Sequence, residues 1–246
     1  MQTWRFIDHG PRDAATNMAI DEALLMSGRP TLRLYTWSPS AVSIGYFQAI
    51  REEVNLEACK REGVEVVRRI SGGGAVYHDA QGEITYSLVV PEAAVPGTVQ
   101  DSCAAICSAL VAGLREMGVE AVFSPLNDVV VNGKKISGSA QTRRHGVVLQ
   151  HGTVLVDLDA IRMFSLLRVS AAKIADKGIA AASQRVTSLR AEVGAVDPRA
   201  VREALRKGFA RVFDADLPPE TLTDEEKERI PGLREKYARR QWNLQR

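Results

Sequence analysis

Residues 68–79 read RRISGGGAVYHD, so two arginines precede three consecutive glycines and a His–Asp pair follows them. Each glycine inside a regular element costs roughly 0.5–1 kcal/mol relative to alanine, because its backbone loses more freedom on folding. Two interpretations fit the local pattern about equally: a plain turn, or a backbone that a ligand approaches closely. In the second, bare N–H groups and the guanidinium groups of Arg68 and Arg69 would bind phosphate or another anion.

The segment from Leu126, LNDVVVNGKKISGSAQTRRHG, is the second candidate for chemistry. Asn132-Gly133 between apolar runs predicts a type I′ hairpin turn. Side chains alternate between the two faces of the returning strand. One face then carries Lys135, Ser137 and Ser139, and the other carries Lys134, Ile136 and Gly138. The segment fits either a solvated hairpin tip or a lysine that shares a face with two hydroxyls. Asn127 and Asp128 fit either a turn cap or ligands that hold Mg²⁺ near phosphates.

Two histidines, His78 and His151, lie in strand-like contexts. A single histidine in a strand is more often a hydrogen-bonded structural residue than a catalyst. Neither histidine has a serine or cysteine at motif spacing, so the sequence gives no support for a hydrolase triad.

The composition limits the class of protein. The 246 residues carry a formal net charge of +2, are 45% hydrophobic and contain three cysteines. These are ordinary globular values, and the charge is too small to imply binding of nucleic acid or of a membrane surface. No apolar run is long enough to cross a bilayer. Without a secretory signal, the odd cysteine count predicts reduced thiols in the cytoplasm.

The elements that must position these residues can be read from periodicity and caps. Helices are expected at 16–28 and 100–118, and short strands start at residues 31, 41, 64 and 83. Asp197 before Pro198 predicts a helix start, and Thr223 with Glu226 predicts a capping box. We expect one α/β domain over residues 1–246, with a mixed sheet and a helical C-terminal segment, about 197–246, packed on it.

Five segments, in order, resemble the lipoate-protein ligase A family of the wider biotin/lipoate ligase and octanoyltransferase superfamily. They are NMAIDEAL, SIGYFQ, RRISGGGAVYHD, LNDVVVNGKKISGSAQ and LQHGTVLVDLD, and the resemblance spans roughly residues 5–160. It implies a fold similar to class II aminoacyl-tRNA synthetases and biotin ligase, with a mixed, largely antiparallel sheet. The implied reaction is ATP-dependent: lipoate or octanoate is activated as an acyl-adenylate with Mg²⁺, and the acyl group passes to a lysine of a carrier protein.

The resemblance also implies roles for individual residues. Lys135 would be catalytic and would bridge the carboxylate and the α-phosphate. The residues implied for ATP are Arg69, Gly72, Gly73, Gly74, Ala75, Val76, Tyr77, Asn127 and Asp128, of which Asp128 would also hold the metal. Those implied for the acyl substrate are His78, Ser137, Gly138, Ser139 and His151. The carrier would be a lipoyl domain or a protein like the glycine-cleavage H protein. The chain would either need a separate accessory subunit or act alone.

The same superfamily contains octanoyl and lipoyl transferases, which use no ATP and carry the acyl group on a cysteine. That cysteine lies shortly before the segment equivalent to LNDVVV, where this chain reads VEAVFSPLND with no cysteine. Cys103 and Cys107 lie four residues apart in an apolar helix, and Cys59 lies in a charged one. Although TWRFID and GSAQTRRHG resemble the transferases as well, the missing cysteine and the intact GGGAVYHD favour the ligase activity, with the transferase as the alternative.

Overall fold

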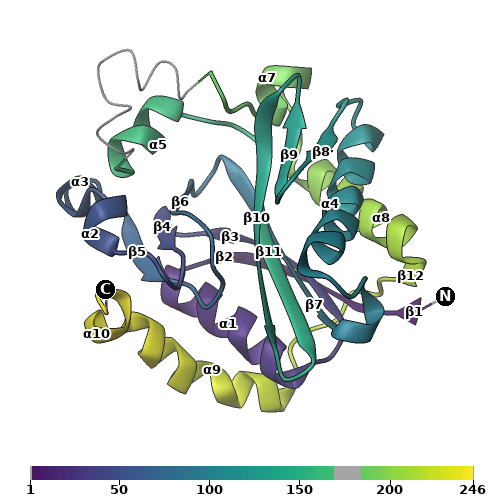
Figure 1. Ribbon diagram of the computed structural model, residues 1–246, viewed down its shortest axis with the longest axis horizontal. Helices are drawn as coiled ribbons and strands as arrows, with labels where there is room; N and C mark the ends of the chain where they lie inside the picture. Colours follow the sequence, from purple (N-terminus) through teal and green to yellow (C-terminus); the bar gives the residue numbers. More distant parts are fainter. Residues whose placement is uncertain (1, 169–183, 246) are drawn as a thin grey trace.

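A seven-stranded sheet forms the centre of the protein, with strand order β2-β3-β7-β11-β10-β9-β8 (Figure 1). The bounds are β2 Arg5–Arg12, β3 Thr31–Trp37, β7 Glu83–Pro91, β11 Val147–Leu155, β10 Lys134–Arg144, β9 Asp128–Val131 and β8 Val122–Ser124. The structure is a computed structural model that describes residues 2–168 and 184–245. Within those ranges β2 and β3 pair in parallel and the other neighbours in this sheet are antiparallel. The predicted mixed, largely antiparallel sheet is confirmed.

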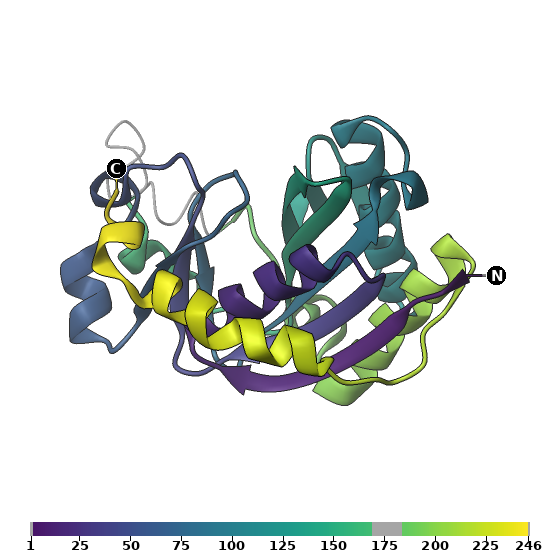
Figure 2. The same cartoon turned by 90° about the horizontal axis from the view of Figure 1, so that it is seen from below.

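Two layers of helices cover the sheet, one on each face (Figures 1 and 2). On one face α4 (Val99–Glu116) packs against α8 (Pro198–Phe213), and their apolar side chains share a core with alternate sheet residues. On the other face α1 (Ala14–Ser27) packs against α9 (Asp224–Ala238) over a second core. The helical C-terminal segment therefore contributes to both layers.

A smaller sheet, with strand order β5-β4-β6, lies beside the large one. Its strands are β4 (Ala41–Ile44), β5 (Glu65–Arg68) and β6 (Val76–His78), so residues 69–75, with the three glycines, connect its two outer strands. Short helices α2 (Ile50–Glu53), α3 (Leu56–Arg61) and α5 (Ala160–Leu166) pack around it. The remaining elements are short: β1 (Gln2–Thr3), η1 (Glu92–Ala94), α7 (Leu189–Val193), β12 (Ala215–Asp216) and α10 (Arg240–Asn243).

The predicted helix and strand boundaries agree closely with the structure. Helix α1 ends at Ser27, and Gly28, with a φ of 65°, is its C-cap. The helix begins two residues earlier than expected because Asp13 caps it. Asp197 caps α8. Thr223 forms the predicted capping box with Glu226 at the start of α9. No helix in residues 2–168 and 184–245 is long and apolar enough to cross a membrane.

The predicted hairpin joins β9 to β10. Asn132 and Gly133 have φ angles of 50° and 75°, and both must be positive in a type I′ turn. Beyond the turn the pairing shifts, since Lys135 pairs with Val130 while Ser137 already pairs with Val129. This β-bulge inserts one extra residue into β10 and breaks the simple alternation of its side chains.

Candidate active site

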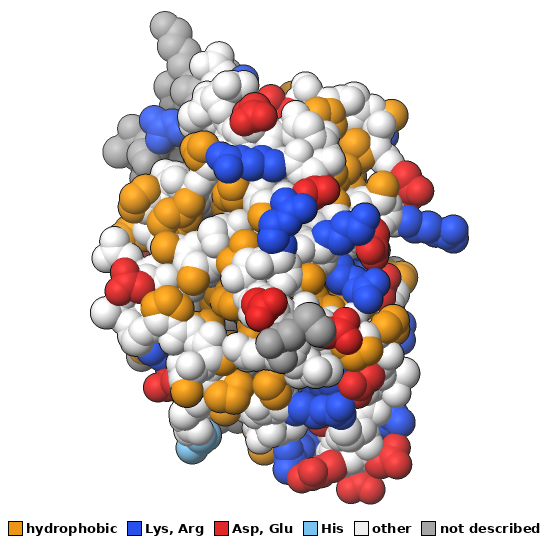
Figure 3. Space-filling model, turned by 90° about the vertical axis from the view of Figure 1, so that its right-hand side faces the viewer, with side chains coloured by type: hydrophobic (Ala, Val, Ile, Leu, Met, Phe, Trp, Pro, Cys, Tyr) orange, Lys and Arg blue, Asp and Glu red, His pale blue; other side chains and the backbone are white. Residues whose placement is uncertain are grey.

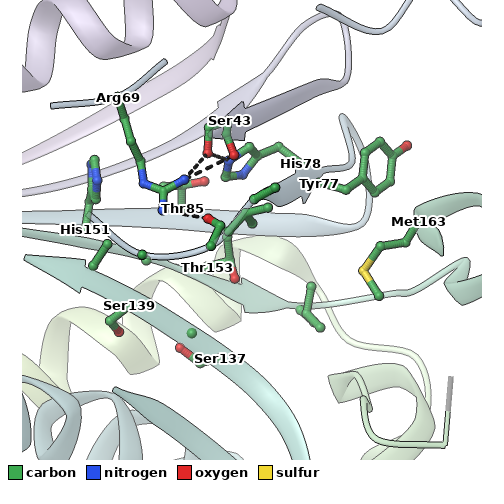
Figure 4. Close-up of a pocket in the computed structure, with 18 of the residues that line it drawn as sticks. Ser43, Arg69, Tyr77, His78, Thr85, Ser137, Ser139, His151, Thr153 and Met163 are labelled. Atoms are coloured by element: carbon green, nitrogen blue, oxygen red, sulfur yellow. Dashed lines mark hydrogen bonds between the residues drawn. The ribbon is translucent and has the colours of Figure 1, made fainter. Parts of the chain in front are cut away.

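A cavity of about 270 Å³ lies between the two sheets (Figure 4). Its lining comes from α1, β3, β4, the glycine loop, β6, β7, β10, β11 and α5. The sequence-predicted residues that line it are Arg69, Gly73, Gly74, Ala75, Val76, Tyr77, His78, Asn127, Lys135, Ser137, Gly138, Ser139 and His151. Two predicted residues, Gly72 and Asp128, are not part of the lining. The fold thus brings segments more than fifty residues apart to one site, and the individual roles remain predictions.

Arg69 holds the glycine loop in place. Its guanidinium donates to the carbonyl oxygens of Gly72 and Gly74 at 2.7 Å each, and to the backbone oxygen of Ser43 at 3.1 Å. It also donates to the hydroxyls of Ser43 at 3.1 Å and of Ser71 at 3.2 Å. Burial lowers the pKa of Arg69 to about 10. We expected this side chain to bind phosphate, but in the structure protein groups accept all of these hydrogen bonds.

Close backbone packing explains part of the glycine run. Gly73 has a φ of 87°, a conformation that side-chain-bearing residues rarely adopt, and its carbonyl oxygen lies against Gly45. A Cβ at Gly45 would overlap that oxygen, whereas a Cβ at Gly72 or Gly74 would meet no protein atom within 4 Å. The close approach is therefore between two protein segments.

Lys135 lies on a different face from the one predicted. Its side chain passes directly over Gly138, where any Cβ would collide with the lysine Cε and Nζ. Ser139, in contrast, shares a 2.8 Å hydrogen bond with the hydroxyl of Tyr86, which lies in the core beneath α4 and α8. The prediction that Lys135 shares a face with Ser137 and Ser139 is wrong, because the bulge resets the alternation between them.

Asn127, Asp128 and Lys135, which the sequence predicts to hold Mg²⁺ or phosphate, all bond to protein groups in the structure. Asp128 Oδ1 lies 2.7 Å from Lys135 Nζ, and the Asn127 amide donates to the backbone oxygen of Ser139. Among the described residues, no group of three or more His, Cys, Asp and Glu side chains is placed to hold a metal ion. In this structure Asp128 thus pairs with Lys135, and Arg69 donates to protein groups, and we derive no step through ATP or Mg²⁺.

His78 belongs to a Ser–His–carboxylate relay. Its Nε2 lies 2.8 Å from Ser43 Oγ, and its Nδ1 lies 2.8 Å from Glu83 Oε1. The ring stacks on Trp37 with centroids 4.0 Å apart. Thr85 donates to the same Glu83 oxygen at 2.6 Å, which fixes the carboxylate.

His151 belongs to a second relay of the same kind. Its Nε2 lies 2.6 Å from Ser71 Oγ, and its Nδ1 lies 3.0 Å from Asp21 Oδ2. The serine partners of both histidines lie far away in sequence, 35 and 80 residues from them, so motif spacing could not reveal either relay. Arg69 donates to both serines and so joins the two relays.

All three cysteines are buried away from the cavity lining. Cys59 packs beside the small sheet, and burial raises its pKa to about 11. Cys107 lies on the buried side of α4, where its Sγ lies 4.0 Å from that of Cys103 and 3.7 Å from Ser139 Oγ. A hydrogen bond with Cys103, together with burial, raises the pKa of Cys107.

Most of the lining residues that the sequence analysis did not name individually are apolar or aromatic. Those residues are Met18, Tyr35, Trp37, Leu155, Met163, Phe164, Leu167 and Val186, and Ser43, Thr85, Ala140, Gly152 and Thr153 complete the lining. Met18 and Ser43 fall in NMAIDEAL and SIGYFQ, so the family resemblance contained the signal for them. The residues from α5 onward gave no signal.

Comparisons with known proteins agree with this fold. The model of the lipoyl protein ligase A/B catalytic domain matches residues 13–210. The bipartite lipoate protein ligase of Thermoplasma acidophilum superposes with a TM-score of 0.92 at 32% identity, covering 99% of this chain and 97% of that one. Lipoate-protein ligase A bound with ATP superposes with a TM-score of 0.88 at 30% identity over 99% of each chain. The scaffold is thus one that binds ATP in a relative.

The curated relatives, however, are transferases. Octanoyltransferase LipM of Kyrpidia tusciae is 42% identical over 99% of each chain, and LipM of Geobacillus kaustophilus is 39% identical over 100% of this chain and 99% of its own. These full-length relatives overturn the ATP-dependent ligase activity that we expected, which is wrong. The expected family is confirmed: the chain belongs to the lipoyl protein ligase A/B catalytic domain family.

Proposed function

We propose that this protein is an octanoyltransferase. It would take an octanoyl group from the thioester of a donor carrier protein and pass it to a lysine of a lipoyl carrier domain, without ATP. The observation that carries the proposal is the 42% identity to an octanoyltransferase across 99% of both chains. A solved relative is described together with its E2 lipoyl domain, which supports a lipoyl domain as the acceptor.

The cavity suits an acyl group of this kind. Met18, Trp37, Leu155 and Met163 contribute apolar lining, and an unbranched eight-carbon chain has no polar group to satisfy. The polar side of the lining includes Ser43, which accepts a hydrogen bond from Arg69, and His78 beside it (Figure 4). An acyl chain would pack on the apolar side and present its carbonyl carbon to the polar one.

Lys135 would stabilise the reacting carbonyl. Its side chain is 41% exposed and pairs with Asp128 over Gly138, within the cavity lining. A preorganised cation beside a developing oxyanion lowers the barrier by about 2.7–4 kcal/mol. In this role Lys135 acts on the tetrahedral intermediate of acyl transfer.

Transfer to a purified acceptor tests the proposal. Octanoyl-loaded acyl carrier protein is mixed with an unmodified lipoyl domain and this protein, without nucleotide, and the acceptor is weighed by mass spectrometry. We expect octanoylation of the acceptor lysine. A parallel arm replaces the loaded carrier with free octanoate, ATP and Mg²⁺. Modification in that arm alone would contradict the proposal. No modification in either arm would indicate that a second protein is required.

A further inference from the structure

Transferases of this superfamily carry the acyl group on a cysteine. This chain has no cysteine at the expected position, so a transferase reaction here needs another nucleophile. None of the three cysteines lines the cavity, and all of them are buried. Ser43 does line it, on strand β4. We propose that Ser43 is the nucleophile and that the octanoyl group is carried as an ester on its Oγ. This inference rests on the proposed octanoyltransferase function.

The geometry around Ser43 is that of an activated serine. With Nδ1–H of His78 donated to Glu83, the Nε2 atom accepts the proton of the Ser43 hydroxyl across 2.8 Å. The carboxylate of Glu83 fixes this tautomer and stabilises the imidazolium that forms when the proton is taken. Both contacts fall within the hydrogen-bond range that such a base needs.

Two neighbours keep the relay in position. Trp37 stacks on the imidazole ring and donates through its Nε1 to Thr85, which donates to Glu83. Arg69 Nη1 donates to Ser43 Oγ at 3.1 Å, so a positive charge lies next to the oxygen that must become nucleophilic (Figure 4). A nearby cation favours the ionised form of a group, here the serine alkoxide.

The second relay gives an internal comparison. Ser71 has the same kinds of partner, since it bonds to His151 and to Arg69, and His151 bonds to Asp21. Both serines are buried, with relative exposures of 2% for Ser43 and 0% for Ser71, but Ser43 is part of the cavity lining and Ser71 is not. An acyl group in the cavity therefore reaches one of the two serines.

The reaction balances in two steps. Ser43 Oγ attacks the thioester carbonyl while His78 Nε2 takes the hydroxyl proton. The C–S bond then breaks, and the departing thiolate receives that proton as the carrier thiol. The neutral amine of the acceptor lysine next attacks the ester, and His78 accepts an amine proton. The C–O bond breaks, an amide forms, and His78 returns the proton to Ser43 Oγ.

Intact-protein mass spectrometry after incubation with octanoyl-loaded carrier tests this assignment. A variant without cysteines (Cys59→Ala, Cys103→Ala and Cys107→Ala) is expected to acquire one octanoyl group, and peptide mapping should place it on Ser43. The adduct should survive neutral hydroxylamine, which cleaves thioesters. Ser43→Ala should lose the adduct and reduce transfer by roughly four orders of magnitude or more, as expected for loss of a triad nucleophile. Ser71→Ala is the matched control and should still form it.

Ser43→Cys provides a second readout that does not depend on loss of activity. Its adduct should lie at position 43 and become labile to neutral hydroxylamine. Circular dichroism of each variant checks folding. A wild-type adduct on any cysteine, or normal transfer by a folded Ser43→Ala variant, would overturn the assignment while leaving the octanoyltransferase function intact. Failure of the wild-type protein to transfer octanoate from the carrier would instead overturn the function and the assignment together.

Discussion

The adjacent residues Lys134 and Lys135 have different surroundings. Lys135 lines the cavity over Gly138, whereas Lys134 is exposed at the start of β10. The β-bulge, and not the simple alternation of a strand, selects which lysine reaches the site.

Lys135→Ala should therefore reduce kcat/KM for octanoyl transfer by roughly 10²–10³, the usual loss for one preorganised oxyanion donor. Its ion pair with Asp128 is partly exposed and contributes only about 0–1 kcal/mol to stability, so the melting temperature should change little. Lys134→Ala is the matched control and should retain activity. Equal losses in both variants would contradict the placement of Lys135 in the site.

Asp21 is a buried carboxylate held by several donors. Arg33 donates to it at 2.7 Å, and Tyr35 and His151 donate at 3.0 Å. Burial acts to raise the pKa of Asp21, but the hydrogen bond from His151 and the charge of Arg33 outweigh it, and the net shift is downward.

Asp21→Asn should lower the free energy of unfolding by roughly 3–5 kcal/mol at pH 7, because Arg33 loses its buried counter-charge. The folded pKa lies below the unfolded value of about 3.9, so this stabilisation is complete above pH 4 and disappears as the pH falls through the folded pKa. Urea titrations of both proteins from pH 7 to pH 3 should show the difference narrow only below about pH 4. Asp8→Asn, at an exposed pair with Arg202, should change stability by about 1 kcal/mol or less. A pH-independent difference for Asp21→Asn would contradict the ionised state.

The glycine loop, residues 69–75, is held in position by close backbone contact. Arg69 fixes its carbonyl oxygens, and Gly45, directly after β4, leaves space for the oxygen of Gly73. The loop in turn forms one wall of the cavity.

Gly45→Ala should move this loop and impair transfer, because the new Cβ would overlap the Gly73 oxygen, a backbone atom that cannot rotate away. We expect a loss of kcat/KM of about tenfold or more, together with a lower melting temperature. Gly10→Ala is the control, since a Cβ there meets no atom within 4 Å. Unchanged kinetics in Gly45→Ala would show that the loop position does not limit the reaction.

A buried ion pair joins the first strand of the main sheet to the C-terminal helical segment at the scale of the whole molecule. Arg5 on β2 pairs with Glu226 on α9, and both side chains are almost completely buried. Glu226 also closes the capping box with Thr223, so one carboxylate joins the first strand of the main sheet to a helix 221 residues later. Trp242 and Asn243 accept hydrogen bonds from Arg68, which ties the C-terminal segment to the base of the glycine loop.

Glu226→Ala should lower the free energy of unfolding by roughly 3–5 kcal/mol, since it leaves the Arg5 guanidinium buried without its partner. Glu225→Ala is a close control: its pair with Arg229 is exposed and contributes about 0–1 kcal/mol. Chemical denaturation followed by circular dichroism measures both. Similar losses in the two variants would show that burial of the Arg5–Glu226 pair has no special weight.

One face of the molecule carries charged side chains of both signs (Figure 3). In the view of Figure 3, Lys and Arg side chains alternate with Asp and Glu, and no extended patch of one sign is visible. This mixture of charges agrees with the small formal net charge of +2.

The sequence by itself determined the elements and the family, because caps, turn residues and hydrophobic periodicity act over a few neighbouring residues. Asp197, Thr223 and Asn132-Gly133 acted as predicted for that reason. Only the tertiary structure decided which side chains meet. The serine partners of His78 and His151 lie 35 and 80 residues away from them, and no local pattern records such distances.

The same limit explains the predictions about Arg69 and Lys135. A bulge changes the face of a strand through its pairing with the neighbouring strand, so Lys135 could not be placed from alternation alone. The partners of Arg69 come from β4 and from the loop that it supports, because a buried guanidinium must satisfy its donors wherever the fold offers acceptors. Local sequence therefore specified the parts of the site, and long-range packing specified their chemistry.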